Sequence, residues 1–229
     1  LSSYPAQYVS YRLQPNESIF IDGDLSEPAW GKVPWTSEPF VDIAQSIYPE
    51  LKVPGRFATA VKVRWDSSFL YVAARLSEPL VWGSIVGENA DLTGGKAPYW
   101  NNDFEVFVDV AGSTHFYKEF EMNARNATYD VLWRVPDKGL NSAGVPCEAE
   151  ASAGPLWCSN SSFFPGQRWS MAPKLRAATS VAKDAGQLSG ALLPFGPALP
   201  TEWLAEIAFP IRGGKGVPGE GGKADPGPG

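Results

Sequence analysis

Apolar and polar residues alternate along most of this chain, which is the two-residue period of a β-strand. The segment at 59–66 (TAVKVRWD) places Val61 and Val63 on one face and Lys62 and Arg64 on the other. A short Asp-Ser-Ser turn follows, so this segment and the next form a predicted hairpin. The segments that follow the same pattern and are predicted as strands are Phe69–Glu78, Asp103–Val110, His115–Asn123, Tyr129–Val135, Trp169–Val181 and Glu202–Pro210.

Short strands separated by turns are typical of an antiparallel β-sandwich. We therefore predict an all-β, jelly-roll-like sandwich with long loops and no amphipathic helix. The chain has 229 residues and is 44% hydrophobic, which is enough for one well-filled core. We place the sandwich at residues 17–210, after an N-terminal extension at 1–16 and before a Gly/Pro-rich tail or linker at 211–229.

The charge and composition of the chain exclude several classes of protein. It has 25 acidic and 19 basic residues, a net charge of −6, and no basic cluster of the kind that binds nucleic acid. A single histidine, His115, and two cysteines are too few for a His-rich zinc site or an iron–sulfur cluster. No apolar run approaches the roughly 20 residues of a membrane span.

Two features predict a secreted, extracellular or cell-surface glycoprotein. Three N-glycosylation sequons begin at Asn16, Asn126 and Asn160. Cys147 and Cys158 have ten residues between them, too many for a redox Cys-x-x-Cys motif, and we expect them to form a disulfide. The chain is then a mature form from which a signal peptide before Leu1 has been removed.

Several motifs, taken in order, resemble family 9 carbohydrate-binding modules. They are Ile21–Trp30 (IDGDLSEPAW), Val61–Asp66 with Leu70–Ala74, Asn102–Asp109 (NDFEVFVD), Tyr117–Asn123 with Tyr129–Asp130, and Trp203–Pro210 (WLAEIAFP). Together they cover about residues 17–210. The resemblance implies a β-sandwich outside the cell that binds oligo- or polysaccharides and catalyses no reaction.

The resemblance also implies a set of site residues. Trp100 matches the family's stacking tryptophan, Glu105 matches a hydroxyl acceptor, and Asn123 matches a polar partner on the returning strand, with Asn102 beside them. An aromatic face for sugar C–H groups and fixed polar groups for hydroxyls are what sugar binding requires. Where family members carry an arginine, this chain has Glu121, and the family's second stacking tryptophan has no match after Trp203–Pro210.

Other tryptophans are predicted to serve the core rather than a ligand. Trp30, Trp65, Trp133 and Trp203 lie in strand-like or motif segments and are expected to be buried, whereas Trp82 and Trp157 lie in loop-like sequence and fit either role.

Two catalytic or redox alternatives are weaker. Glu105, Glu119 and Glu121 offer carboxylates for glycoside hydrolysis, but a flat sheet face is expected to leave them solvated, ionised and without a raised pKa. Haem ligation has His115 with Met122 or Met171 as its candidates. His115 and Met122 are seven residues apart and so face opposite sides of one strand, which leaves only His115 with Met171.

A third alternative is structural. An acidic glycosylated sandwich with a Pro/Gly tail also suits one module of a surface or matrix glycoprotein that contacts other extracellular glycoprotein subunits and has lost sugar binding. No cofactor is expected apart from structural calcium, which some members of the resembled family carry. The acids Asp22, Asp24 and Glu27 are spaced loosely like a calcium loop, but turn formation explains them better.

Overall fold

A computed structural model of the chain describes residues 7–42, 44, 47–87, 98–114, 117–133, 176–181 and 202–211. Within these residues nearly all regular structure is β-strand, and every predicted strand segment overlaps an observed strand. The elements are β1 (Tyr11–Arg12), α1 (Pro28–Gly31), the 3-10 turn η2 (Gly55–Phe57), β2 (Thr59–Trp65), β3 (Phe69–Ser77), the 3-10 turn η3 (Pro98–Trp100), β4 (Asp103–Val108), β5 (Tyr117–Asn123), β6 (Thr128–Trp133), β7 (Arg176–Val181) and β8 (Glu202–Pro210).

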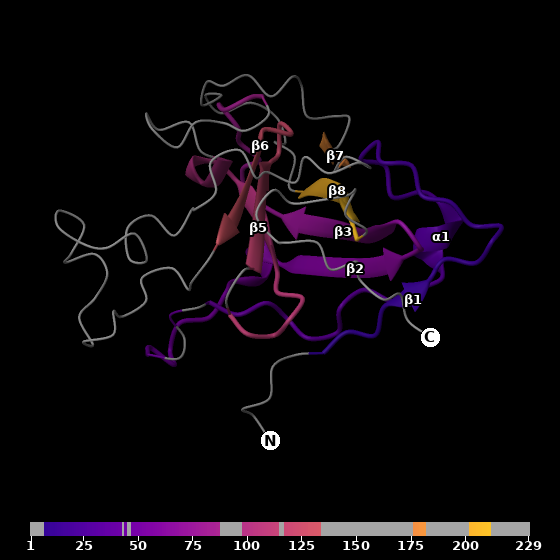
Figure 1. The fold of residues 1–229 in the computed structure, drawn as a ribbon. Coiled ribbons are helices and arrows are strands. Elements are labelled where there is room, and N and C mark those ends of the chain that lie inside the picture. Colours follow the sequence, from indigo (N-terminus) through magenta and orange to yellow (C-terminus); the bar gives the residue numbers. More distant parts are fainter. Residues whose placement is uncertain are drawn as a thin grey trace, which may run out of the picture.

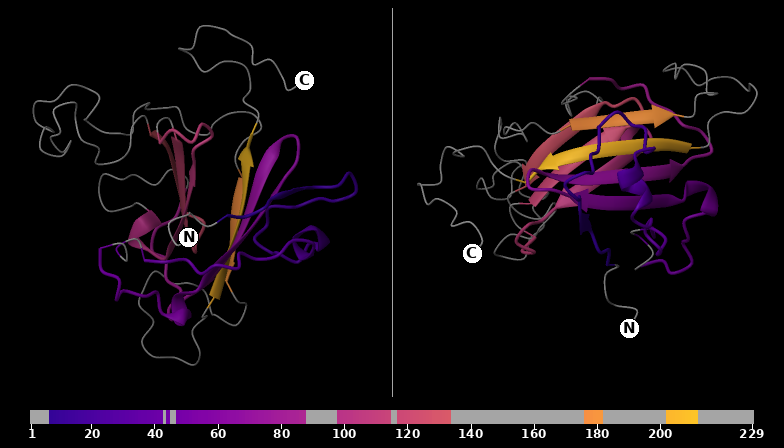
Figure 2. Two further views of the ribbon diagram at one scale, coloured as in Figure 1. Left: turned by 90° about the horizontal axis from the view of Figure 1, so that it is seen from below. Right: turned by 90° about the vertical axis from the view of Figure 1, so that its right-hand side faces the viewer.

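The strands form two sheets that face each other (Figures 1 and 2), so the predicted all-β sandwich is confirmed. One sheet has the order β1-β2-β3-β8-β7 and the other the order β4-β5-β6. All neighbouring strands are antiparallel except β1, which pairs parallel to β2 through Tyr11 and Arg12. The sandwich therefore begins before residue 17, where the sequence pattern places its start.

The main core lies between the two sheets. Alternation along β3 and β8 sends one set of side chains inward, where they meet apolar residues of β4 and β5. Phe120 and Phe209, one from each sheet, touch edge to face with ring centroids 5.5 Å apart. The buried members of this core are Val72, Ala74, Leu76, Val81, Phe104, Phe120, Met122, Ala124, Trp203, Ala205, Ile207 and Phe209.

A second core covers the opposite face of the five-stranded sheet. There the N-terminal segment and α1 lie over β3 and β8, on the side away from the three-stranded sheet (Figure 2). Lys62 and Arg64 share this covered face and are buried. Each donates to a main-chain carbonyl, Lys62 to Trp30 at 2.6 Å and Arg64 to Ala29 at 2.7 Å. The polar face read from the sequence is thus an interior face whose cations have fixed partners.

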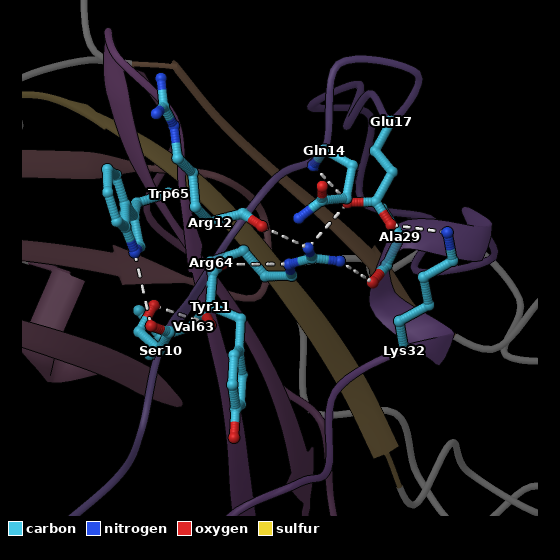
Figure 3. A network of polar contacts seen from close by, with 10 residues as sticks. All are labelled: Ser10, Tyr11, Arg12, Gln14, Glu17, Ala29, Lys32, Val63, Arg64 and Trp65. Carbon is cyan, nitrogen blue, oxygen red and sulfur yellow. Dashed lines mark hydrogen bonds and ion pairs between the residues drawn. The ribbon is translucent and has the colours of Figure 1, made fainter.

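Arg64 ties the N-terminal segment to β2 (Figure 3). Besides Ala29, its guanidinium donates to the carbonyls of Tyr11 and Arg12 and to the Glu17 carboxylate, at 3.3, 2.9 and 2.8 Å. Arg64 and Glu17 are both almost fully buried. A planar guanidinium with several donors suits this cluster of acceptors better than a lysine would.

Glu206 on β8 makes a second tie to the same segment. One carboxylate oxygen accepts the N–H groups of Asp22 and Gly23 at 3.0 and 3.1 Å, and the other accepts the indole N–H of Trp30 at 2.9 Å. Gly23 has φ +84°, and a Cβ there would lie 2.6 Å from the Thr179 carbonyl carbon. Only glycine fits this turn, which explains the Asp-Gly pair of the sequence motif.

The tryptophan predictions are partly confirmed. Trp30 and Trp203 are fully buried, as expected. The prediction for Trp65 is wrong, because its side chain is 36% exposed at the end of β2, with the Arg12 guanidinium 5.4 Å from its ring. Trp65 lies where the strand leaves the core, so its alternation no longer guarantees burial. Trp82 is half-buried, the side chain of Trp133 is not among those described, and Trp157 lies outside the described residues.

Replacing Arg64 with methionine is expected to lower the free energy of unfolding by about 3 kcal/mol. The substitution breaks a buried ion pair and leaves buried carbonyl groups without a hydrogen-bond donor. Lys32 pairs with the same Glu17 carboxylate at 2.7 Å but is 56% exposed. Lys32→Met is therefore the control and should cost less than about 1 kcal/mol. Urea unfolding of both variants measures the difference, and equal losses would contradict this role of Arg64.

Candidate functional site

The outward face of the three-stranded sheet carries a group of carboxylates. Phe104 and Met122 point into the core, so alternation places Asp103 and Glu105 of β4 and Glu119 and Glu121 of β5 on the opposite side. We call these four residues the acidic face. The register sets Glu105 directly opposite Glu121, which confirms that the two predicted strands pair. Asp109 lies beyond β4 and instead accepts the N–H groups of its own turn, at Ala111 and Thr114.

Trp100 stands at one end of this face. It is the last residue of η3, a turn that contacts both β4 and β5. Its side chain is 59% exposed, and its ring centroid is 5.7 Å from that of Tyr99. An exposed indole held by a turn that packs on two strands can offer a flat face to a ligand.

The two asparagines of the predicted set differ in what they can offer. Asn123 is fully buried, and its amide is used within the protein. It donates to the Ile85 carbonyl and to Asn101 at 2.9 and 2.8 Å, and it accepts the N–H groups of Arg125 and Ala127, both at 2.9 Å.

Asn102 is half-buried and keeps one group free. Its side-chain oxygen accepts the Trp82 N–H. Its side-chain nitrogen has no partner among the described residues, although it is not sealed from solvent. Asn123 therefore organises the loop that carries Trp100, whereas Asn102 still has a donor for a ligand.

Three carboxylates of the acidic face crowd together. Asp103, Glu105 and Glu121 each place an oxygen within 4.8 Å of the others. Burial holds the pKa of Asp103 well above its usual range, and the negative charge of Glu105 adds to the shift. Burial likewise raises the pKa of Glu121, helped by a hydrogen bond with Glu119 and by the charge of Asp103. The expectation that this face keeps its acids solvated and without a raised pKa is therefore wrong for these two residues.

This finding does not turn the acidic face into a glycosidase site. A general acid must reach the glycosidic oxygen. Both oxygens of Asp103 and one oxygen of Glu121 are inaccessible to solvent, and Glu121 as a whole is only 3% exposed, so the groups with raised pKa values are poorly placed to reach a substrate. Glu105 is the exposed carboxylate of the three, and a single accessible carboxylate cannot supply an acid and a nucleophile.

A second acidic group includes two of the residues spaced like a calcium loop. Asp22 and Glu27 come within 4.8 Å of Glu206, and Asp24 is not part of the group. Asp22 accepts the Asp24 N–H at 2.8 Å, and Glu27 accepts the Phe20 N–H at 2.9 Å. Since Glu206 uses both oxygens to hold the N-terminal segment, this group serves the turn. The sequence pattern does not single out Glu206, although a lone acid in an otherwise apolar strand (WLAEIAFP) is a signal of a buried acid.

Several other predicted residues can be placed. Asn16 and Asn126 are exposed, as a glycosylation acceptor must be. Met122 is buried in the core between the sheets. The residues that lie outside those described are Asn160, Cys147, Cys158, His115 and Met171. No helix among the described residues is long and apolar enough to cross a membrane.

Comparison with known proteins returns similar solved structures only. No protein-family model and no curated protein sequence matches the chain. Two structures of a family 9 carbohydrate-binding module from Caldicellulosiruptor kristjanssonii, with cellotriose and with glucose, share 15% and 16% identity at a TM-score of 0.44. They match over 88% and 90% of this chain and 67% and 68% of those chains.

A carbohydrate-binding protein candidate from Bacteroides uniformis shares 13% identity at a TM-score of 0.46, over 88% of this chain and 71% of that one. The family that the sequence motifs resemble is thus also found among the similar solved structures. At these identities and TM-scores the similarity assigns no role to any residue of this chain.

Asn123→Ala is expected to lower the free energy of unfolding by about 2–3 kcal/mol, because it leaves buried N–H and C=O groups without partners. Asn16→Ala, at an exposed asparagine, is the control and should change it by less than about 0.5 kcal/mol. Thermal and urea unfolding compare the two variants. A stability of Asn123→Ala equal to that of the control would place Asn123 outside the framework of the site.

Glu206 predicts a pH dependence of stability. Burial raises its pKa from 4.5 to about 7, against the opposing hydrogen bonds from Trp30, Gly23 and Asp22. The native state then binds this proton more tightly than the unfolded chain, so the associated stability is full below pH 4.5 and is lost as pH rises through 7. Glu206→Gln should flatten the decline, and Glu202→Gln, at a half-exposed residue of the same strand, should retain it. Urea titrations across this pH range measure the slope, and an unchanged slope in Glu206→Gln would contradict the assignment.

Proposed function

We propose that this domain is a non-catalytic glycan-binding module. Its site consists of Trp100 and the polar residues beside it, Asn102 and Glu105. The observation that carries the proposal is the exposed indole of Trp100. It lies on a turn that packs against β5 and against β4, the strand that bears Glu105. A surface of this kind offers a flat apolar platform next to polar groups at fixed positions, which is what a sugar ring requires.

Each contact of the proposed site has a defined role. The Trp100 ring stacks on the C–H face of a sugar. Glu105, exposed on β4, accepts sugar hydroxyls through charge-assisted hydrogen bonds. The free side-chain nitrogen of Asn102 donates to a hydroxyl. We leave Asn123 out of the contact set, because its amide is already fully hydrogen-bonded.

We also propose that the module works outside the cell as a glycoprotein. The exposure of Asn16 and Asn126 supports glycosylation at these two sequons. Glycosylation at Asn160 and the disulfide between Cys147 and Cys158 remain predictions. Mass spectrometry of the secreted protein before and after deglycosylation and reduction tests all of these modifications.

A second candidate function is structural, as a module of a surface or matrix glycoprotein assembly. The observation that favours it is a set of exposed apolar side chains on one segment, comprising Phe40, Val41, Ile47 and Tyr48. Exposed apolar patches are often protein-contact surfaces. Under this function the domain assembles with protein partners and binds no sugar, so the experiment below separates the two candidates.

A glycan array that includes cello-, xylo- and galacto-oligosaccharides is the first test, followed by titration calorimetry with the ligand it selects. Trp100→Ala is expected to lower the affinity for that glycan at least tenfold, about 1.4 kcal/mol, because the stacking contact is lost. Trp65→Ala also removes an exposed tryptophan, but on the other sheet, and should leave the affinity unchanged. A blank array with folded protein, or equal binding by both variants, would contradict the proposal.

A further inference from the structure

Arg125 differs from the other arginines that the structure describes. The guanidinium of each of the others lies on an aromatic ring or bonds to a carboxylate or a main-chain carbonyl; these are Arg12, Arg56, Arg64, Arg75 and Arg176. Arg125 is exposed in the turn between β5 and β6. Among the described residues, none forms an ion pair, a ring contact or a hydrogen bond with its guanidinium. Its charged donors are therefore available to a ligand.

The methylene groups of Arg125 are nevertheless held in place. They lie against Gly83, which is buried. A Cβ added to Gly83 would come within 2.9 Å of the Cγ and 3.2 Å of the Cδ of Arg125. Gly83 does not have a positive φ, so it is the space taken by the Arg125 side chain that requires glycine there. A long side chain whose methylene groups pack on the protein holds its charged end at the surface.

This contact belongs to the same framework as the turn that carries Trp100. The residues on either side of Gly83 donate their backbone N–H groups to the side-chain oxygens of Asn102 and Asn101, which directly follow Trp100. The residue before Arg125 donates its N–H to the Asn102 carbonyl at 3.3 Å, which continues the register of β4 and β5. Arg125 and Trp100 thus belong to neighbouring turns at one end of the three-stranded sheet.

We propose that Arg125 makes the site selective for acidic sugars, by binding the carboxylate of a uronic acid unit while Trp100 stacks on a ring of the same oligosaccharide. A planar guanidinium binds a carboxylate through two parallel hydrogen bonds. Because the methylene groups are already packed, less side-chain freedom is lost when a ligand binds. This inference rests on the proposed function and names the class of its ligand.

The charge around the site makes the contact with Arg125 important. The chain has a net charge of −6, and Glu105 is exposed on β4. An acidic ligand is therefore repelled by much of this surface. The hydroxyl groups of the sugar can still donate to Glu105, while its carboxylate is directed to Arg125. Without the guanidinium only the repulsion remains, so the loss of Arg125 should affect acidic sugars and spare neutral ones.

The experiment is titration calorimetry of the full chain with oligogalacturonate and oligoglucuronate, each beside its methyl ester, which has the same sugar units without the charge. The wild-type chain is expected to bind one of the acidic probes about tenfold more tightly than its ester. Arg125→Gln should remove this preference and leave the affinity for the ester unchanged. Trp100→Ala should lower the affinity for both. A sulfated galacto-oligosaccharide shows whether any anionic group suffices.

Two further variants test how the guanidinium is held. Gly83→Ala adds a Cβ that displaces the methylene groups of Arg125 but keeps its charge, so it should weaken binding of the acidic probe in the same direction as Arg125→Gln. Arg56→Gln is the control, because it removes an exposed arginine that lies on Phe57 in η2. It should leave both affinities unchanged.

Several results would overturn this inference. They are equal binding of the acidic probes and their esters, acidic binding that Arg125→Gln leaves unchanged, tighter binding of the sulfated probe than of the carboxylated ones, or acidic binding that Trp100→Ala leaves unchanged. Binding of neutral oligosaccharides or esters alone, with a loss in Trp100→Ala, would overturn the role of Arg125 and leave the proposed function intact. Binding of no oligosaccharide by folded protein would overturn both.

Discussion

The hydrogen bonds of Glu206 hold the structure together, because they fix the N-terminal segment on the outer face of the five-stranded sheet. With that cover in place, β3 and β8 are buried on both sides, and the sheet can carry a second core beneath α1. Without it, Phe69 and Tyr71 would face water. Arg64 makes the matching tie on β2. The sandwich thus depends on two buried ionisable side chains whose partners are mainly backbone groups, and these hydrogen bonds offset part of the cost of burying them.

Buried acids occur at two places in this protein, and the difference between them separates framework from site. Around Glu206 both oxygens of the buried residue accept N–H groups that fix the N-terminal segment, so this residue is structural, although the Glu27 Oε2 beside it has no hydrogen-bond partner. On the acidic face, Glu121 is buried, Asp103 is half-buried with both carboxylate oxygens inaccessible to solvent, and oxygens of both residues have no hydrogen-bond partner. A fold that keeps such a cluster gives up stability at that point, which is typical of a surface with a function. Because the cluster lies next to the exposed Trp100, we expect this function to be ligand binding.

Much of the fold follows from the sequence, because period-two alternation and turn residues act locally. β8 occupies the predicted segment Glu202–Pro210 from end to end. The features that the sequence does not predict depend on contacts between residues far apart in the chain. The outer cover over Lys62 and Arg64 cannot be predicted from the β2 sequence, since it comes from residues up to Trp35. The exposure of Trp65 depends on where the sheet ends. The residue types of the candidate site could be predicted from the sequence. Which of their side chains are accessible to a ligand could not, as the full burial of Asn123 shows.

We expect ligands to bind at the exposed end of the three-stranded sheet, beside Trp100. Nitrogen-15 NMR of the tryptophan indoles tests it most directly, because the side-chain N–H of each tryptophan reports its own surroundings. During titration with the oligosaccharide that the protein binds, we expect a saturable shift of the Trp100 indole resonance, while the indole resonances of Trp65, Trp30 and Trp203 stay in place. A saturable shift at Trp65 with Trp100 unmoved would contradict it and place the binding surface on the other sheet.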